Sequence, residues 1–260
     1  MPGKDRQRQL AREKLQRQMA KRAEAARRRR RAQAVTGSAL AVVAVIAVAG
    51  FGIAKLSHGG KKPKASANVA VCLYPKSTGS AARKVTIPPL TGAKKGTAKV
   101  AITTNQGDLT LTLNRAKAPC TVNSFISLVK QKYFDNTPCH RLTTSGIFVL
   151  QCGDPSGTGG GGPGYQFAEE GLPAGGGTGI TYPAGTVAMA NAGPGTNGSQ
   201  FFLVYKDTSL PPNYTMFGTI SGGQDALLAI AKAGAVGPTG KPIADGKPKK
   251  PVTITAVKLA

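Results

Sequence analysis

The chain has 260 residues, of which 35 are Lys or Arg and 11 are Asp or Glu, so its formal net charge is +24. Its 34 glycines and 18 prolines argue against an all-helical protein, and an apolar share of 40% argues against a wholly disordered one. The excess charge is uneven, because residues 97–260 hold only 13 basic and 8 acidic residues. A basic balance indicates a nucleic-acid-binding domain only where it lies on a folded face, so we do not expect nucleic acid as a partner.

Residues 1–34 form a basic tail with 13 basic and 3 acidic residues. The tail is rich in good helix formers, but its few apolar residues make no convincing helical stripe. Two interpretations stay open. The tail is either a solvated, partly helical segment, or a patch that binds anionic lipid or nucleic acid through its arginines.

Residues 35–54 carry no charge and lie between Arg31 and Lys55. A helix of this length spans roughly 30 Å, enough to cross a bilayer, so we expect one transmembrane helix that acts as a signal anchor. The positive-inside rule then places the Arg-rich tail in the cytoplasm and the rest of the chain outside, at the cell membrane. The alternative is a cleaved signal peptide, because the Ala-Val-Ala of residues 47–49 fits a cleavage site.

Residues 55–97 are rich in Lys, Gly, Pro and Ser and predict a linker, with a short apolar patch at 69–74 that we expect to dock. Residues 98–260 are numerous enough to bury a core and predict the working domain.

The four cysteines all follow the hydrophobic segment and show no zinc-ligand spacing, so we expect no metal site. Their even number on the oxidising side of a membrane favours disulfides, with buried free thiols as the alternative. They are Cys72, Cys120, Cys139 and Cys152.

The pattern of the domain predicts many short strands and two helices. Alternation over 99–104 and 109–113 predicts a hairpin, and apolar residues at i, i+3, i+4 and i+7 predict a helix over 121–130 with Thr121 as its N-cap. A glycine-rich loop follows at 153–179. This mainly β pattern is typical of a closed antiparallel barrel capped by helices. The other predicted strands cover 141–142, 148–151, 186–189, 201–204, 216–220 and 252–257, and the second helix covers 224–233.

Residues 189–202 read Met-Ala-Asn-Ala-Gly-Pro-Gly-Thr-Asn-Gly-Ser-Gln-Phe-Phe. This run resembles the signature of the cyclophilin family of peptidyl-prolyl cis-trans isomerases, and residues 139–141, 151–154 and 216–218 resemble further family segments. The resemblance extends from about Val100 to Val257. It implies a closed eight-stranded antiparallel barrel with two capping helices, proline-containing polypeptides as substrates and no cofactor.

The isomerisation needs a group that favours a twisted amide over a planar one, because resonance sets a barrier of about 18–20 kcal/mol. A fixed cation that donates to the prolyl nitrogen does this, and the resemblance assigns the role to Arg141. The resemblance also implies the substrate-binding residues Phe148, Val149, Gln151, Ala190, Asn191, Gln200, Phe202, Leu210, Tyr214 and Phe217.

The resemblance also constrains the cysteines. If Arg141 and Gln151 both face the substrate, strand alternation puts Cys139 on the face of Arg141 and Cys152 on the opposite face. We therefore expect no Cys139–Cys152 bridge, and expect both residues to pair with Cys72 and Cys120 in an order left open.

The leading hypothesis is an exported, membrane-tethered prolyl isomerase that assists the folding of proteins outside the cytoplasm. The alternative is a non-catalytic chaperone module that binds proline peptides on the same scaffold.

Overall fold

The computed structural model describes residues 68–172 and 179–260 of the chain, and this part is mainly β with two helices, as predicted. The helices are α2 (Pro119–Lys130) and α3 (Gln224–Ala233). Two short antiparallel pairs stand apart from the main sheet, β1 (Val69–Val71) with β2 (Thr91–Ala93) and β8 (Ile180–Tyr182) with β11 (Thr208–Leu210).

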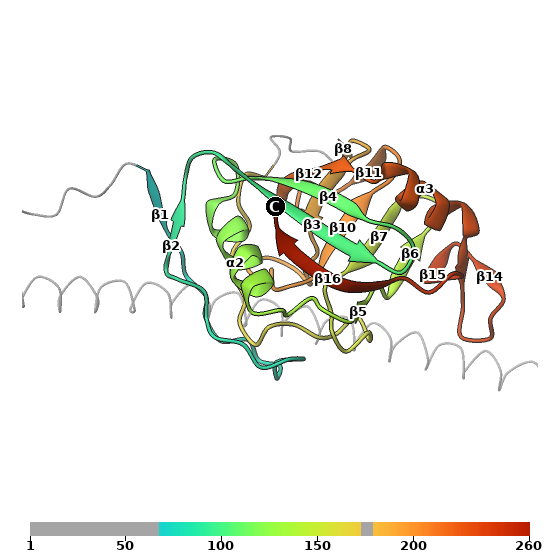
Figure 1. Cartoon of the computed structure of the whole chain (residues 1–260), viewed down its shortest axis with the longest axis horizontal. Helices are drawn as coiled ribbons and strands as arrows, with labels where there is room; N and C mark the ends of the chain where they lie inside the picture. Colours follow the sequence, from blue (N-terminus) through green and yellow to red (C-terminus); the bar gives the residue numbers. More distant parts are fainter. Residues whose placement is uncertain (1–67, 173–178) are drawn as a thin grey trace, which may run out of the picture. The chain divides into compact units, whose positions relative to one another are not determined.

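Twelve strands form one curled antiparallel sheet (Figure 1). Their order is β14 (Pro242–Ile243), β13 (Ala235–Val236), β15 (Asp245–Pro248), β6 (Arg141–Thr143), β7 (Val149–Cys152), β10 (Phe201–Val204), β9 (Thr186–Met189), β12 (Met216–Gly222), β4 (Leu109–Asn114), β3 (Thr97–Thr104), β16 (Thr253–Leu259) and β5 (Thr137–Pro138).

The sheet differs from the closed barrel of eight strands that the sequence analysis predicts. The strand order has two ends, because β6 uses its second edge to pair with β15, while β16 pairs with β3 and β5. The segment 137–143 changes partner midway, from β16 at Thr137–Pro138 to β7 at Arg141–Thr143. No periodic signal marks the short strands β5, β13, β14 and β15 in the sequence, because two to four residues are too few to show alternation.

The two faces of the sheet carry different side chains. Leu142, Leu150, Leu203 and Val187 lie opposite one another across β6, β7, β10 and β9, and all are buried. They share the inner core with apolar side chains of both helices. Figure 1 shows α2 on the side of the sheet that carries β1 and β2, and α3 toward the opposite side, near β15.

Helix α2 begins two residues earlier than predicted, at Pro119, and Thr121 is not its N-cap. The cap residue Ala118 makes no side-chain hydrogen bond. Instead the distant Glu170 carboxylate accepts the N–H groups of Cys120 (3.0 Å) and Thr121 (2.7 Å). A carboxylate from another part of the chain therefore satisfies the free N–H groups of the first turn.

Residues 68–96 are not a free linker, because they pack against the sheet domain. Alternate side chains of the predicted apolar patch, Ala70, Cys72 and Tyr74, are buried in the inner core, which confirms that the patch docks. Cys72 forms a disulfide with Cys120 in α2. The predicted membrane span 35–54 lies outside the described residues, and among those that are described no helix has the length and apolar character to cross a bilayer.

The second disulfide joins Cys139 to Cys152, so the expected pairing of these residues with Cys72 and Cys120 is wrong. Cys152 does point inward, as alternation predicts, because it lies next to outward-facing Gln151 and is 1% exposed. The error concerns Cys139.

Alternation fails at Cys139 because the chain changes strand partner there. The Cys139 N–H still donates to the Val252 carbonyl (2.9 Å), in line with the β5–β16 pairing. Thr137 and Cys139 are buried, and the next buried residue is Leu142, three positions on. Cys139 therefore lies on the inner face together with Cys152, although Arg141 faces outward.

Candidate functional site

A row of opposed residues crosses the outer face of the sheet. Arg141 lies opposite Gln151, Gln151 opposite Phe202, and Phe202 opposite Ala188. Ala188 in turn lies opposite Met216 on β12. Because side chains alternate along each strand, this register turns the whole row away from the inner core.

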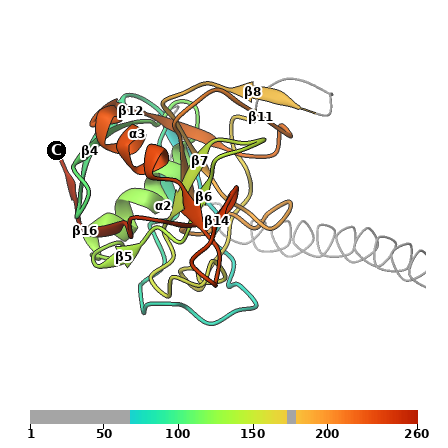
Figure 2. The same cartoon turned by 90° about the vertical axis from the view of Figure 1, so that its right-hand side faces the viewer.

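The row contributes to a pocket of about 150 Å³. The ring of Phe202 meets Tyr214 edge-on, with 5.5 Å between the ring centroids, and the 4% exposed Phe202 forms a satellite apolar cluster with Val149 and Leu210. Figure 2 shows β11, which carries Leu210, on the other side of β6 and β7 from α2. The lining residues are Arg141, Ile147, Val149, Gln151, Ala190, Asn191, Phe202, Leu210 and Tyr214.

Eight of the eleven predicted site residues line this pocket, and three lie elsewhere. Phe148 packs against Tyr205 at 6.0 Å, with the Lys206 ammonium 4.6 Å from its ring, and Ile147 takes its place in the pocket. Phe217 is fully buried in the inner core at 5.4 Å from Phe125, because it follows Met216, which lies opposite outward-facing Ala188, and alternation turns it to the inner face.

Gln200, the third of these, lies beside the pocket and is hydrogen-bonded to Gln151. Its Oε1 accepts a hydrogen bond from Gln151 Nε2 (2.9 Å), and its own Nε2 donates to the carbonyls of Gly159 and Gly161 (both 2.9 Å). Gln151 in turn accepts from Arg141 Nη1 (3.2 Å). The glycine-rich loop is therefore tied to the arginine through two glutamines.

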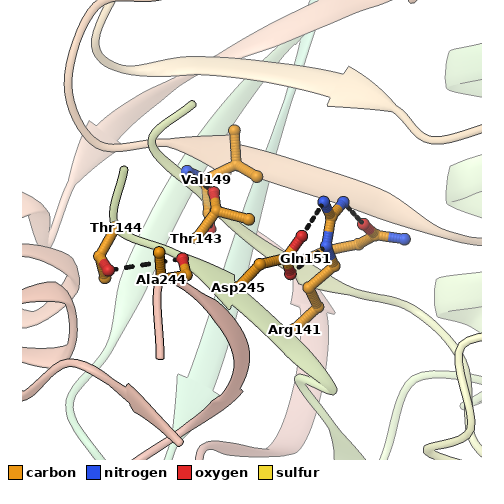
Figure 3. A network of polar contacts seen from close by, with 7 residues as sticks. All are labelled: Arg141, Thr143, Thr144, Val149, Gln151, Ala244 and Asp245. Atoms are coloured by element: carbon orange, nitrogen blue, oxygen red, sulfur yellow. Dashed lines mark hydrogen bonds and ion pairs between the residues drawn. The ribbon is translucent and has the colours of Figure 1, made fainter. Parts of the chain in front are cut away.

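Besides Ile147, the sequence analysis missed Asp245 on β15. Its carboxylate accepts hydrogen bonds from Arg141 Nε (2.8 Å) and Nη2 (2.7 Å), a two-pronged ion pair that Figure 3 shows beside Gln151. Pairing of Asp245 with Thr143, and the bond from the Thr144 N–H to the Ala244 carbonyl (2.8 Å), hold β15 against β6. Asp245 is the one acidic residue after Asp225, which is the signal that marks it in the sequence.

These contacts fix the direction of the Arg141 guanidinium. Asp245 and Gln151 take three of its five N–H donors, which leaves two for a ligand. The hydrogen bonds with Asp245 raise the pKa of Arg141, and the same bonds lower the pKa of the Asp245 carboxyl. Among the residues that the structure describes, Arg141 is the one charged residue that lines the pocket.

The neighbouring His140 adds no second cation at neutral pH, because burial lowers its pKa below the usual value. The side chain of Asn191 makes its hydrogen bonds within the protein, with Nδ2 donating to the Asn213 carbonyl (2.9 Å) and Oδ1 accepting from the Gly193 N–H (3.2 Å). Its backbone N–H and carbonyl have no partner in residues 68–172 and 179–260, so they are available to an extended peptide. Within those residues no group of three or more His, Cys, Asp or Glu side chains is placed to hold a metal ion.

Asp154 orders the glycine-rich loop beside the pocket. Its carboxylate accepts the N–H groups of Ser156 (2.8 Å), Gly159 (2.8 Å) and Gly161 (3.0 Å) and the hydroxyl groups of Ser156 (2.7 Å) and Thr158 (3.3 Å). A Cβ on Gly161 would overlap the Asp154 carboxylate, so this position requires glycine. Burial raises the pKa of Asp154, but the hydrogen bonds outweigh it and the pKa lies below its usual value.

We expect Asp154→Asn to destabilise the fold by about 1–3 kcal/mol at neutral pH, because a buried acceptor of five hydrogen bonds is lost. The lowered pKa sets the sign of the pH dependence. Above the ordinary Asp pKa of about 3.9, the carboxylate makes its full contribution to the free energy of unfolding. That contribution is lost as pH falls through the lower pKa of the folded state.

Urea unfolding of the native chain and of Asp154→Asn across pH 3–7 tests this. The difference in free energy of unfolding between the native chain and Asp154→Asn should shrink toward acid pH. The control Asp108→Asn, at an exposed position, should change this free energy little at any pH. A constant difference over the whole range would contradict the role of the charged carboxylate.

Comparison with known proteins identifies the family to which the chain is similar. Residues 99–259 match the family model for the cyclophilin type peptidyl-prolyl cis-trans isomerase/CLD. The probable peptidyl-prolyl cis-trans isomerase B of Mycobacterium tuberculosis is 50% identical over 214 residues, covering 75% of this chain and 66% of that protein. The protein of the same name in Mycobacterium leprae is 47% identical over 212 residues, covering 75% of this chain and 68% of that protein. The chain thus spans about two thirds of the length of these relatives.

Solved structures agree as well. A cyclophilin type peptidyl-prolyl cis-trans isomerase of Cryptosporidium parvum is 30% identical, with a TM-score of 0.53, and the match covers 64% of this chain and 98% of that one. A crystal structure of the same protein in the presence of the dipeptide Ala-Pro is 32% identical, with a TM-score of 0.51, and covers 62% and 98%. The family model alone covers more than half of the chain, and the chain belongs to the cyclophilin-type peptidyl-prolyl cis-trans isomerase family.

Proposed function

We propose that this chain catalyses rotation about Xaa-Pro peptide bonds in polypeptide segments. The observation that carries the proposal is the pocket itself, a partly apolar pocket of about 150 Å³ with one oriented guanidinium at its wall. Phe202, Val149 and Leu210 offer apolar contacts to a proline ring. The free backbone groups of Asn191 pair with the residue before proline.

Arg141 supplies the chemistry. As the Xaa-Pro bond twists out of plane, the prolyl nitrogen regains its lone pair and becomes a hydrogen-bond acceptor. The two remaining guanidinium donors favour this twisted state over the planar amide, and Asp245 and Gln151 hold them in place beforehand. The reaction then needs no nucleophile and no cofactor.

We further infer that the isomerase acts on exported proteins, tethered to the cell membrane by residues 35–54 with the domain outside. The uncharged run between Arg31 and Lys55 supports a membrane span. The two disulfides support an oxidising compartment, since such bonds persist there and are rare in the cytosol. The basic tail is suited to contact with anionic lipid.

Arg141→Ala should lower kcat/KM for a proline peptide by about 100-fold or more, because the lost donors act in the transition state. Isomerisation is measured with a short Ala-Pro peptide, alongside peptide binding and circular dichroism as controls for site and fold. Near-normal turnover in a folded variant would contradict the mechanism. A native chain that binds the peptide without isomerising it would favour the non-catalytic chaperone instead.

Asp245→Asn should lower kcat about tenfold with KM little changed, because Asp245 positions Arg141 and does not touch the substrate. Asp245→Glu, which restores the charge, should recover part of the loss. The Arg141 hydrogen bonds lower the Asp245 pKa, so the ion pair is intact above the ordinary Asp pKa and breaks as pH falls through the lowered value.

The native enzyme should therefore lose activity in that acid range, and Asp245→Asn should lack this step in its pH profile. Asp225→Asn, at another exposed carboxylate, is the matched control and should behave as the native chain. Equal kcat values for the native chain and Asp245→Asn would show that Gln151 orients the guanidinium alone.

Protease added outside intact cells tests the proposed topology. The domain should be released from a membrane-bound stub while the Arg-rich tail stays protected. Recovery of a soluble chain that begins near Phe51 would contradict the anchor and support cleavage after Ala49.

A further inference from the structure

The N-terminal segment 68–96 precedes the region matched by the family model, and it carries an exposed apolar face. Five of the nine large apolar side chains that the described part of the chain exposes belong to this short segment. Three of them, Val69, Val71 and Leu73, alternate along β1 and just beyond it, so they point to one side. Val71 is 80% exposed and Leu73 is 73% exposed, so this side of the strand has no cover from the rest of the described chain.

The outer edge of β1 also carries backbone groups that are open to a partner. In an antiparallel pair, every second residue bonds across to the neighbouring strand. The Cys72 N–H and the Asn68 carbonyl both bond to residues that flank β2, at 2.8 and 2.9 Å. The N–H and carbonyl groups of residues 69, 71 and 73 therefore point away from β2, and none of them bonds to another backbone group in the described part of the chain.

Helix α2 and a disulfide hold β1 in place. Cys72 is bonded to Cys120, and Gly92 lets the strand pair approach α2, because a Cβ there would come 2.7 Å from a backbone oxygen of that helix. The Cys120 sulfur lies 3.6 Å from the Val71 carbonyl, but a disulfide sulfur has no proton to donate, so this carbonyl stays an open acceptor. In Figure 1, β2 lies nearer to α2 and β1 is the outer strand of the pair. The edge is thus formed before any partner binds.

This edge lacks the usual protection against strand addition. Unpaired edges commonly carry a proline or a charge that prevents another strand from pairing. The two end strands of the twelve-stranded sheet follow this rule, β14 with Pro242 and β5 with Pro138. Residues 68–74, which include β1, contain neither a proline nor a charged residue. An extended polypeptide can therefore pair with this edge through its backbone.

The charge around the edge indicates which strand fits it. Lys94 and Lys95 lie beside the start of β1, Lys76 follows its other end, and all three are exposed. Between Glu24 and Asp108 the sequence has no acidic residue. A second copy of β1 paired with this edge would bring lysines toward lysines, whereas acidic residues at the ends of an added strand would be attracted.

We propose that the outer edge of β1 binds an extended, proline-free polypeptide segment as an added antiparallel strand, with apolar residues at alternate positions and acidic residues at its ends. The antiparallel arrangement is that of the strand pairs in the described part of the chain. Proline is excluded because the paired positions must donate N–H groups. This interaction surface lies outside the proline pocket and goes beyond the proposed isomerase function.

The test measures binding of the full chain to a fluorescent peptide, Asp-Thr-Val-Thr-Val-Thr-Val-Asp. Residues that exchange hydrogen bonds across an antiparallel pair lie on the same face, so the valines should pair with residues 69, 71 and 73. Methylation of the valine nitrogens should weaken binding about tenfold or more, because the paired donors are lost. Methylation of the threonine nitrogens, which point away from β1, should have little effect. Lysines in place of the two aspartates should weaken binding about tenfold.

Two variants test the same edge from the side of the protein. Val71→Pro removes an edge donor and leaves the bonds between β1 and β2, so it should weaken binding about tenfold or more. Leu73→Thr should weaken binding about threefold, and its matched control Leu228→Thr, at an exposed position on α3, should bind as the native chain does. Turnover of a short Ala-Pro peptide reports whether each variant is folded.

Absence of binding to the native chain, or equal binding of the two methylated peptides, would overturn the proposal. A dimer of the full chain that Val71→Pro dissociates in sedimentation would assign the edge to a second copy and overturn it as well. A native chain that binds the peptide with the expected selectivity but does not isomerise Ala-Pro would support this surface and contradict the isomerase function alone.

Discussion

The register of β6, β7, β10 and β9 is the constraint on which both the core and the site depend. It places Arg141, Gln151 and Phe202 in one outward row, and the leucines at 142, 150 and 203 in one inward row. Because side chains alternate, a slip of one residue would bury the guanidinium and expose the leucines. The inner leucine and aromatic core therefore keeps the outer site in register, and mutations far from the pocket that loosen the core also disorder the site.

Much of this arrangement is readable from the sequence. Alternation predicts the hairpin of β3 and β4, helical spacing predicts α2 and α3, and the run 189–202 carries the family resemblance. That resemblance also predicts eleven site residues one by one, and eight of them line the pocket. The exceptions have local causes, since Phe217 follows outward-facing Met216 and so turns inward, and Ile147 takes the place of Phe148 in the pocket.

Other features depend on contacts between distant parts of the chain and have no local signal. Asp245 reaches Arg141 only because β15 pairs with β6, a hundred residues earlier in the chain, and β15 is too short to show a pattern. The Cys139–Cys152 bridge follows from a change of strand partner that alternation does not register. Glu170 replaces the expected cap of α2 for the same reason, because the sequence shows candidates for contacts but not which distant residue meets them.

The place of β16 in the sheet has a consequence for biosynthesis. This strand lies between β3 and β5, although β3 is made about 150 residues before it. During vectorial synthesis, β3 has only β4 as a neighbour until residues 253–259 emerge, and Asp245 reaches Arg141 only shortly before. The nascent domain is thus long exposed as an incomplete sheet with a non-functional site. The sheet is therefore completed, and the guanidinium oriented, only by β15 and β16, which lie within residues 245–260 of the sequence.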